Sequence, residues 1–210
     1  MPDPSNLQPE FKYFSAEVFT NVYDGVNQIK MPKSLMILGF SNDKDAAIPV
    51  RHDNYIFRRE VLRDLLAFLR KPNGDALFIT GPTGSGKTSV VNEVCARLNW
   101  PVQLLTLNNR FEFSQLTGHF TYSSQKEGGA PEMTFQYGPL AKAMKYGHVL
   151  VLNEIDLADA GELAGLNDVL EGRPLVLADN AGEIIHPHPL FRVVATANSC
   201  GNGDGTGRYM

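Results

Sequence analysis

The chain has 210 residues, of which 43% are hydrophobic and 20% are charged, and its formal net charge is −4. This length suffices for one α/β domain plus an additional segment, and the composition excludes collagen-like and low-complexity proteins. The slight acidity indicates neither a nucleic-acid nor a membrane partner. The sequence has no apolar run of about 18 residues and no signal peptide, so we expect a cytoplasmic protein without a membrane span.

The first 50 residues differ from the rest and are interpreted as an N-terminal extension. Phe11, Phe14, Val18 and Val22 recur at helical spacing, which predicts one short amphipathic helix. This extension is either a docking arm for a partner or a segment that packs against its own domain.

Helices and strands alternate along the remainder of the chain. Apolar residues at helical spacing predict a helix over residues 61–69 and another over residues 87–98. Residues 76–80 form a short apolar run without alternation, as expected of a parallel strand that is buried on both faces. A second strand is predicted over residues 102–107.

The second half begins with an irregular polar region, residues 108–137, in which Gly128, Gly129 and Pro131 indicate a loop or hairpin. The elements predicted beyond it are a helix 138–144, a buried strand 149–152, a helix 162–170, a hairpin of 175–177 and 183–185, and a buried strand 191–197. Strands that alternate with helices predict an α/β fold, in which helices cover both faces of a parallel sheet.

A glycine-rich motif follows the strand 76–80 and opens the helix 87–98. Its residues are Gly81, Pro82, Thr83, Gly84, Ser85, Gly86, Lys87 and Thr88. This is the complete P-loop pattern, in which glycines let several backbone N–H groups point at a phosphate and the helix N-terminus adds positive charge. Lys87 is expected to reach the β- and γ-phosphates and the Thr88 hydroxyl to coordinate Mg²⁺, so ATP and Mg²⁺ are the predicted cofactors.

The strand 149–152 ends in two polar residues, Asn153 and Glu154. In P-loop ATPases an Asp at the end of this strand holds the Mg²⁺ shell and the following Glu polarises the attacking water. Glu154 is therefore the candidate catalytic carboxylate, and its alternative is a solvated side chain at a strand end. Asn153 occupies the metal position without a negative charge, so we expect weakened Mg²⁺ binding.

Asn198 follows the strand 191–197 directly. If this strand neighbours the one that carries Glu154, the Asn198 side chain can orient the water that attacks the γ-phosphate. Considered alone, an asparagine at this place is an ordinary turn residue. Together with the two other motifs it is a candidate catalytic residue.

Residues 81–88, 152–156 and 188–198 together resemble the MoxR-type AAA+ ATPases. The branch that they resemble most contains the CobS subunit of cobaltochelatase and the CbbQ and NirQ activators. Residues 137–144 and 203–209 support the same branch, and the resemblance covers about three quarters of the chain. It implies a three-layer P-loop sandwich around a parallel sheet.

This resemblance also implies roles for individual residues. Residues 81–88 correspond to the Walker A motif, Asn153 and Glu154 to the end of Walker B, and Asn198 to sensor 1. Lys87, Glu154 and Asn198 are then catalytic, and Thr88 and Asn153 belong to the metal site. The segment before the first helix lies near the adenine in this family, which assigns nucleotide contacts to Tyr55, Ile56 and Phe57.

Two hairpins and the oligomeric state follow from the resemblance as well. Residues 121–134 correspond to the helix-2 insert and residues 175–185 to the hairpin before sensor 1, and both line a pore and engage partners in the family. The implied protein is a homo-oligomeric ring, expected to be a hexamer. It remodels or activates a partner, often one with a von Willebrand A-type domain.

The chain departs from the family pattern at Asn153 and at its end. Met210 falls where the family continues into the arginine finger, the last strand and a helical lid. We therefore expect residues 51–210 to be a nucleotide-binding subdomain that lacks its lid, with very weak turnover. Two alternatives to a hydrolysing ring remain, namely a non-hydrolysing assembly module and a nucleic-acid-associated nucleotidase.

Overall fold

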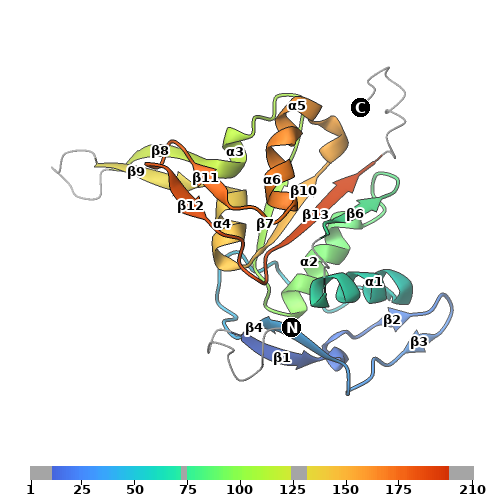
Figure 1. Ribbon diagram of the computed structural model, residues 1–210. Helices are drawn as coiled ribbons and strands as arrows, with labels where there is room; N and C mark the ends of the chain where they lie inside the picture. The colour runs from blue at the N-terminus through green and yellow to red at the C-terminus, as the bar shows by residue number, and fades with distance from the viewer. Residues whose placement is uncertain (1–10, 72–74, 124–131, 199–210) are drawn as a thin grey trace.

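A computed structural model describes residues 11–71, 75–123 and 132–198. Its centre is a four-stranded sheet in the order β6 (Leu77–Thr80), β13 (Arg192–Ala197), β10 (Val149–Asn153) and β7 (Val102–Thr106). All three pairings in this sheet are parallel. Figure 1 shows helices on either side of these strands. The predicted α/β fold with a parallel central sheet is confirmed.

Two apolar cores cover the two faces of the sheet. The longest helices in the described residues are α1 (Arg59–Arg70), α2 (Lys87–Arg97) and α4 (Pro139–Tyr146). Val149 and Val151 of β10 join the core that contains α1 and α2, whereas Leu150 and Leu152 join the core that contains α4. Alternate residues of a strand point to opposite faces, so β10 is buried on both sides.

The outer strands of the sheet, β6 and β7, are less buried than the two strands between them. All residues of β13 are buried, but Phe78 in β6 is 54% exposed and Leu104 in β7 is 43% exposed. The expectation that residues 76–80 are buried on both faces is therefore wrong. In the described residues β6 has a hydrogen-bonded neighbour on one side only, which leaves part of it open to water.

The region predicted as one helix over residues 162–170 consists of three short helical pieces. These are α5 (Ala160–Leu163), the 3-10 turn η4 (Ala164–Leu166) and α6 (Asn167–Leu170), preceded by the 3-10 turn η3 (Ile155–Leu157). Glycine lowers helix stability, and a Cβ atom at Gly165 would lie 2.7 Å from the ring of Phe113. The close packing of Phe113, which precedes α3 (Ser114–Thr117), favours a glycine there.

The N-terminal segment forms strands. The prediction of an amphipathic helix from Phe11, Phe14, Val18 and Val22 is therefore wrong. The strand β1 (Phe11–Ser15) pairs with β4 (Met36–Phe40), the 3-10 turn η2 spans Ala16–Val18, and β2 (Val22–Tyr23) pairs with β3 (Gln28–Ile29) and β5 (Phe57–Arg58). Phe19 and Val22 are buried in the same core as α1 and α2. The segment thus packs against its own chain, as one of the two interpretations predicts.

Two hairpins lie beyond the sheet; the sequence predicts the second, and for the first it indicates a loop or a hairpin. The first joins β8 (Gly118–Ser123) to β9 (Glu132–Tyr137), and the second joins β11 (Leu175–Leu177) to β12 (Glu183–Ile185). Figure 1 shows the first hairpin projecting from the body of the molecule with the second beside it. Glu183 of the second hairpin links them, because its carboxylate accepts a hydrogen bond from Tyr137 of the first at 2.7 Å. The same carboxylate accepts a hydrogen bond from Lys145 of α4 at 2.9 Å.

Candidate functional site

The glycine-rich motif lies between β6 and α2, in the strand–loop–helix context that a P-loop requires. Gly84 has φ of 76° and Gly86, the N-cap of α2, has φ of 85°, so both adopt the left-handed conformation that a side chain disfavours. Residues 82–85 are exposed. The loop therefore presents accessible backbone at the N-terminus of an 11-residue helix, where an anion is favoured.

Lys87 connects this loop to the end of a second strand. Its Nζ donates hydrogen bonds to the carbonyl oxygens of Gly81 at 2.7 Å and Pro82 at 3.0 Å, and to Asn198 Oδ1 at 2.9 Å. The parallel pairing of β6 with β13 places residues 81 and 198 at the same edge of the sheet (Figure 1). The structure thus brings together Lys87 and Asn198, two of the predicted catalytic residues.

Asn153 connects the start of α2 to two strands. Its Oδ1 accepts hydrogen bonds from Thr88 Oγ1 and Thr196 Oγ1, each at 2.7 Å, and its Nδ2 donates to Thr106 Oγ1 at 3.4 Å. Thr196 is fully buried, so its hydroxyl needs such an acceptor. Sequence reasoning did not identify Thr106 or Thr196, although a threonine within the apolar run 193–197 signals a buried polar contact.

Glu154 and Asp156 complete the edge at the end of β10. Glu154 has φ of 57° and ψ of 46°, a conformation that costs a residue other than glycine free energy and is common in functional sites. Its N–H points to Thr196 Oγ1 at 3.4 Å, and Asp156 Oδ2 accepts a hydrogen bond from the Asn198 N–H at 3.1 Å. β10 and β13 are adjacent, which is the condition set above for Asn198 to act beside Glu154.

The three residues assigned to the adenine differ in exposure. Phe57 is fully buried between Phe19 and Tyr55, so its side chain belongs to the core and its assignment as a direct nucleotide contact is corrected. Tyr55 is half-buried, and burial, followed by the negative charge of Glu93, raises the pKa of its hydroxyl. Ile56 is 62% exposed and lines a groove of about 530 Å³ together with Arg58.

The described residues contain no cluster of three or more His, Cys, Asp or Glu side chains that could hold a metal ion. Thr88 and Asn153 do present oxygen atoms at the phosphate loop. Mg²⁺ prefers oxygen ligands and usually keeps several waters while it binds substrate phosphates. This donor set therefore fits Mg²⁺ that arrives with a nucleotide. Within the described part of the chain, no helix is long and apolar enough to span a membrane.

Comparison with known proteins identifies relatives of this chain. The chain is 31% identical over 165 residues to the aerobic cobaltochelatase subunit CobS of a Sinorhizobium species, covering 79% of this chain and 48% of CobS. It is 34% identical over 145 residues to an uncharacterised protein of Staphylococcus saprophyticus, covering 69% of this chain and 54% of that protein. The chain thus spans about half the length of these relatives.

The fold is shared with a solved structure from Cytophaga hutchinsonii that is provisionally named an ATPase. The TM-score is 0.52 at 17% identity, and the match covers 69% of this chain and 39% of that one. Residues 76–207 match the family described as AAA domain, dynein-related subfamily. That range contains the phosphate loop, both strand ends and both hairpins. The chain therefore belongs to the dynein-related subfamily of AAA domains, which are nucleotide-binding ATPase domains.

Proposed function

We propose that this chain binds ATP with Mg²⁺ along residues 81–88 and hydrolyses it as part of a larger ring. The observation that carries the proposal is the set of contacts at one edge of the sheet. Lys87 reaches Asn198, and Thr88 reaches Asn153, so groups from the phosphate loop, β10 and β13 already meet there. We further propose that residues 51–210 form the nucleotide-binding unit and that residues 1–50 are an extension of it.

The proposed reaction uses each of these groups in turn. The Lys87 ammonium group exchanges its carbonyl acceptors for β- and γ-phosphate oxygens, to which it donates charge-assisted hydrogen bonds. Asn198 then accepts a hydrogen bond from the attacking water. Glu154 takes a proton from that water while the water oxygen bonds to the γ-phosphorus. The bond between the γ-phosphorus and the β–γ bridging oxygen breaks, and ADP leaves with that oxygen.

Mg²⁺ would be held by the Thr88 hydroxyl, by Asn153 through a water molecule, and by the phosphates, and it would neutralise charge on the leaving oxygen.

Asn153 is the observation that favours a second function. Because it brings no negative charge to the metal, the chain can serve as a nucleotide-dependent assembly module that hydrolyses ATP slowly or not at all.

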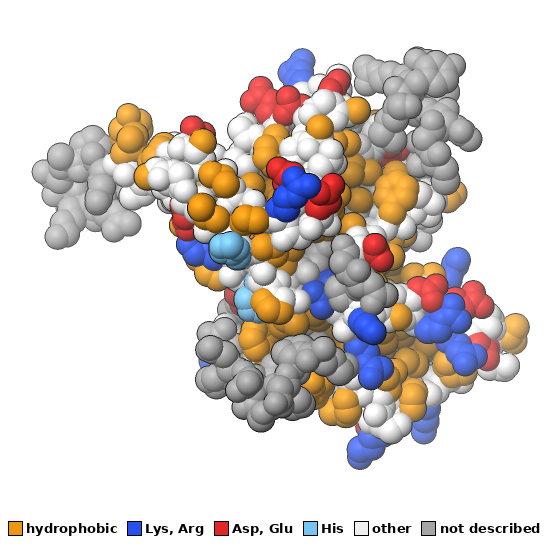
Figure 2. All heavy atoms as spheres, viewed as in Figure 1, with side chains coloured by type: hydrophobic (Ala, Val, Ile, Leu, Met, Phe, Trp, Pro, Cys, Tyr) orange, Lys and Arg blue, Asp and Glu red, His pale blue; other side chains and the backbone are white. Residues whose placement is uncertain are grey.

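The hairpins are the surface that we assign to a partner protein. Their exposed apolar side chains are Phe120, Tyr122, Met133, Val176 and Ile184. Figure 2 shows hydrophobic side chains gathered over this part of the molecule. Apolar patches of this kind mark protein interaction sites.

The relative CobS is a cobaltochelatase subunit, and we propose by analogy a hexameric ring that acts on a partner with a von Willebrand A-type domain.

The first test is a calorimetric titration of a non-hydrolysable ATP analogue, with Mg²⁺, into the 210-residue chain and its Lys87→Ala variant. Binding by the parent and its loss in the variant are expected, because the variant lacks the ammonium group at the phosphates. Glu154→Gln then separates binding from hydrolysis, since it should bind as the parent does and release no phosphate. Equal binding by the parent and Lys87→Ala would overturn the assignment of the phosphate site.

A further inference from the structure

A buried ion pair lies on α2, away from the phosphate loop. Glu93 and Arg97 are each only 3% exposed, and the Arg97 guanidinium contacts the Glu93 carboxylate and donates to the Glu93 carbonyl oxygen at 3.0 Å. Burial raises the pKa of the Glu93 carboxyl, but hydrogen bonds from Arg97 and His52 outweigh it and leave that pKa below its usual value. Buried charges are costly unless they are paired and hydrogen-bonded, so this pair needs an explanation.

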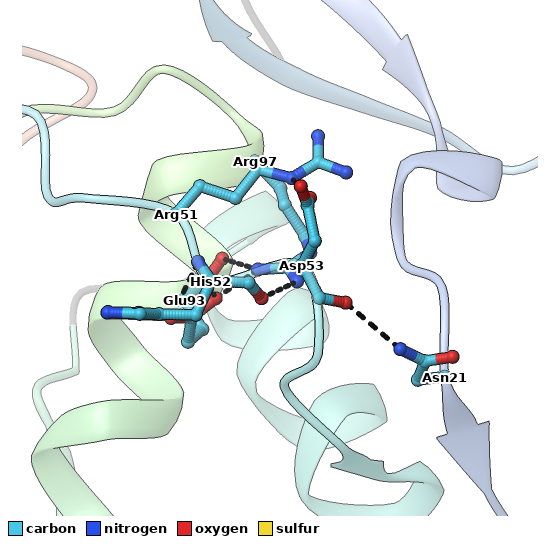
Figure 3. Close-up of polar contacts among 6 residues, drawn as sticks. All are labelled: Asn21, Arg51, His52, Asp53, Glu93 and Arg97. Carbon is cyan, nitrogen blue, oxygen red and sulfur yellow. Dashed lines mark hydrogen bonds and ion pairs between the residues drawn. The ribbon is translucent and has the colours of Figure 1, made fainter.

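The pair binds a segment that comes before α1 in the chain. The His52 N–H lies 3.2 Å from Glu93 Oε1 and 3.3 Å from Oε2, and the His52 ring also contacts Oε1. Arg97 Nη2 donates to the His52 carbonyl oxygen at 3.0 Å. Both backbone groups of His52 are therefore bonded to side chains of α2, as Figure 3 shows.

The N-terminal segment holds the same stretch from its other side. Asn21 Nδ2 donates to the Asp53 carbonyl oxygen at 3.0 Å, and the Phe57 N–H donates to the Asn21 carbonyl oxygen at 2.9 Å. Asn21 has φ of 56°, a conformation that asparagine tolerates better than most residues. We call residues 51–57 the linking segment, because it joins α2 to the N-terminal segment (Figure 3).

The side chains of the linking segment depend on the same contacts. The Arg97 guanidinium lies 4.7 Å from the centre of the Phe57 ring, and that ring makes an edge contact with Tyr55 at 4.8 Å between centres. Ile56, between them, points to solvent with 62% of its surface exposed. Arg97 and Glu93 thus contact the chain on both sides of Tyr55 and Ile56, the two accessible residues that the family resemblance assigns to the adenine.

The distance along α2 suits this arrangement. Glu93 follows Lys87 by six residues, which is about 9 Å along a helix axis. The phosphate loop and the linking segment therefore both bond to side chains of one helix, at positions about 9 Å apart along its axis, which is on the scale of a nucleotide. A ligand whose phosphates bind at Lys87 can extend its nucleoside toward the linking segment.

We propose that Glu93 and Arg97 are positioning residues that hold the linking segment for the nucleoside of ATP, while the phosphates bind independently of them. This inference rests on the proposed function. It predicts that the contribution of adenosine to affinity depends on the contacts on both sides of the linking segment. The affinity for inorganic tripolyphosphate, which has no nucleoside, should be the same whether or not these contacts are present.

The test compares the Kd for a non-hydrolysable ATP analogue with the Kd for tripolyphosphate, both with Mg²⁺, by calorimetry on the full chain. The variant Glu93→Met with Arg97→Met removes both charges together, so that no buried charge is left unpaired. Its preference for the ATP analogue should fall by about tenfold, with tripolyphosphate affinity within about twofold of the parent. The control, Arg63→Gln with Asp64→Asn, removes an exposed ion pair from α1 and should change neither value.

A second variant tests the other side of the linking segment without touching the ion pair. Asn21→Asp keeps the shape and the tolerated φ but replaces the donor to Asp53 with a carboxylate. It should lower the same preference, and it carries the test if the double variant does not fold. An unchanged preference in the folded variants, or failure of the parent to bind tripolyphosphate, would overturn the inference alone. Failure of the parent to bind the ATP analogue would instead overturn the proposed function, and the inference with it.

Discussion

Helix α2 carries a polar cluster toward each of its ends, and the two clusters are built from different interactions. At the first turn, Lys87 and Thr88 bond to carbonyl and amide oxygens at an accessible edge of the sheet. Farther along, Glu93 and Arg97 bond to each other and to His52 with almost no exposure to water. The helix therefore has one end with neutral partners and another with buried charged partners.

This difference indicates what each cluster can do. Neutral acceptors at Lys87 can be exchanged for phosphate oxygens without leaving a buried charge unpaired, so the first cluster suits a ligand that comes and goes. At the second cluster, the loss of one partner leaves the other charge buried and uncompensated. Glu93 and Arg97 are therefore suited to fixing the chain in one arrangement.

The largest effect is expected when one member of the buried pair is removed alone. Glu93→Ala leaves the Arg97 guanidinium buried without its carboxylate and should lower the free energy of unfolding by about 3–5 kcal/mol. Urea titration of the parent and variant measures this change. Asp168→Ala, which removes an exposed partner of Arg173, is the matched control and should change stability by less than about 1 kcal/mol. Similar losses in both variants would contradict the claim that burial makes the loss of one partner of the Glu93–Arg97 pair costly.

A smaller effect is expected at the other end of α2. Asn153→Asp supplies the negative charge that the metal position lacks, while Thr88 and Thr196 can still donate to the new carboxylate. The affinity for a non-hydrolysable ATP analogue should rise by roughly tenfold in Mg²⁺ and little in EDTA. The control Asn42→Asp makes the same replacement of an amide by a carboxylate in an exposed turn. An unchanged Mg²⁺ dependence and turnover would show that the amide serves the metal site as well as a carboxylate.

The two clusters also differ in how far the sequence predicts them. The phosphate loop is contiguous, and Asn153 and Asn198 each follow a recognisable strand, so the adjacency of parallel strand ends brings them together. Glu93 and Arg97 are four residues apart, the spacing of an ordinary exposed ion pair on a helix. Only their burial against the linking segment distinguishes them. That burial depends on contacts with His52, which precedes Glu93 by 41 positions and Arg97 by 45.

Remote contacts also explain the errors in the fold prediction. Phe11 and Phe14 fit helical spacing, but they form a strand because their partners, residues 36–40, arrive later in the chain and complete the pair. The spacing of a few apolar residues cannot distinguish these outcomes. The exposure of Phe78 likewise follows from the outer position of β6 in the described sheet, and no local sequence pattern predicts that position.

The smallest expected effect is a pH dependence of stability that distinguishes the clusters once more. The pKa of Glu93 is lowered in the folded chain relative to its usual value of 4.5. A carboxyl with a lowered pKa contributes stability that is fully present above pH 4.5 and is lost as the pH falls through the folded-state value. The parent should therefore lose more stability below pH 4.5 than the Glu93→Met, Arg97→Met variant, as measured by urea titrations at a series of pH values. Parallel curves would mean that the buried pair contributes no net stability through ionisation of Glu93, and that its role lies only in fixing the position of the linking segment.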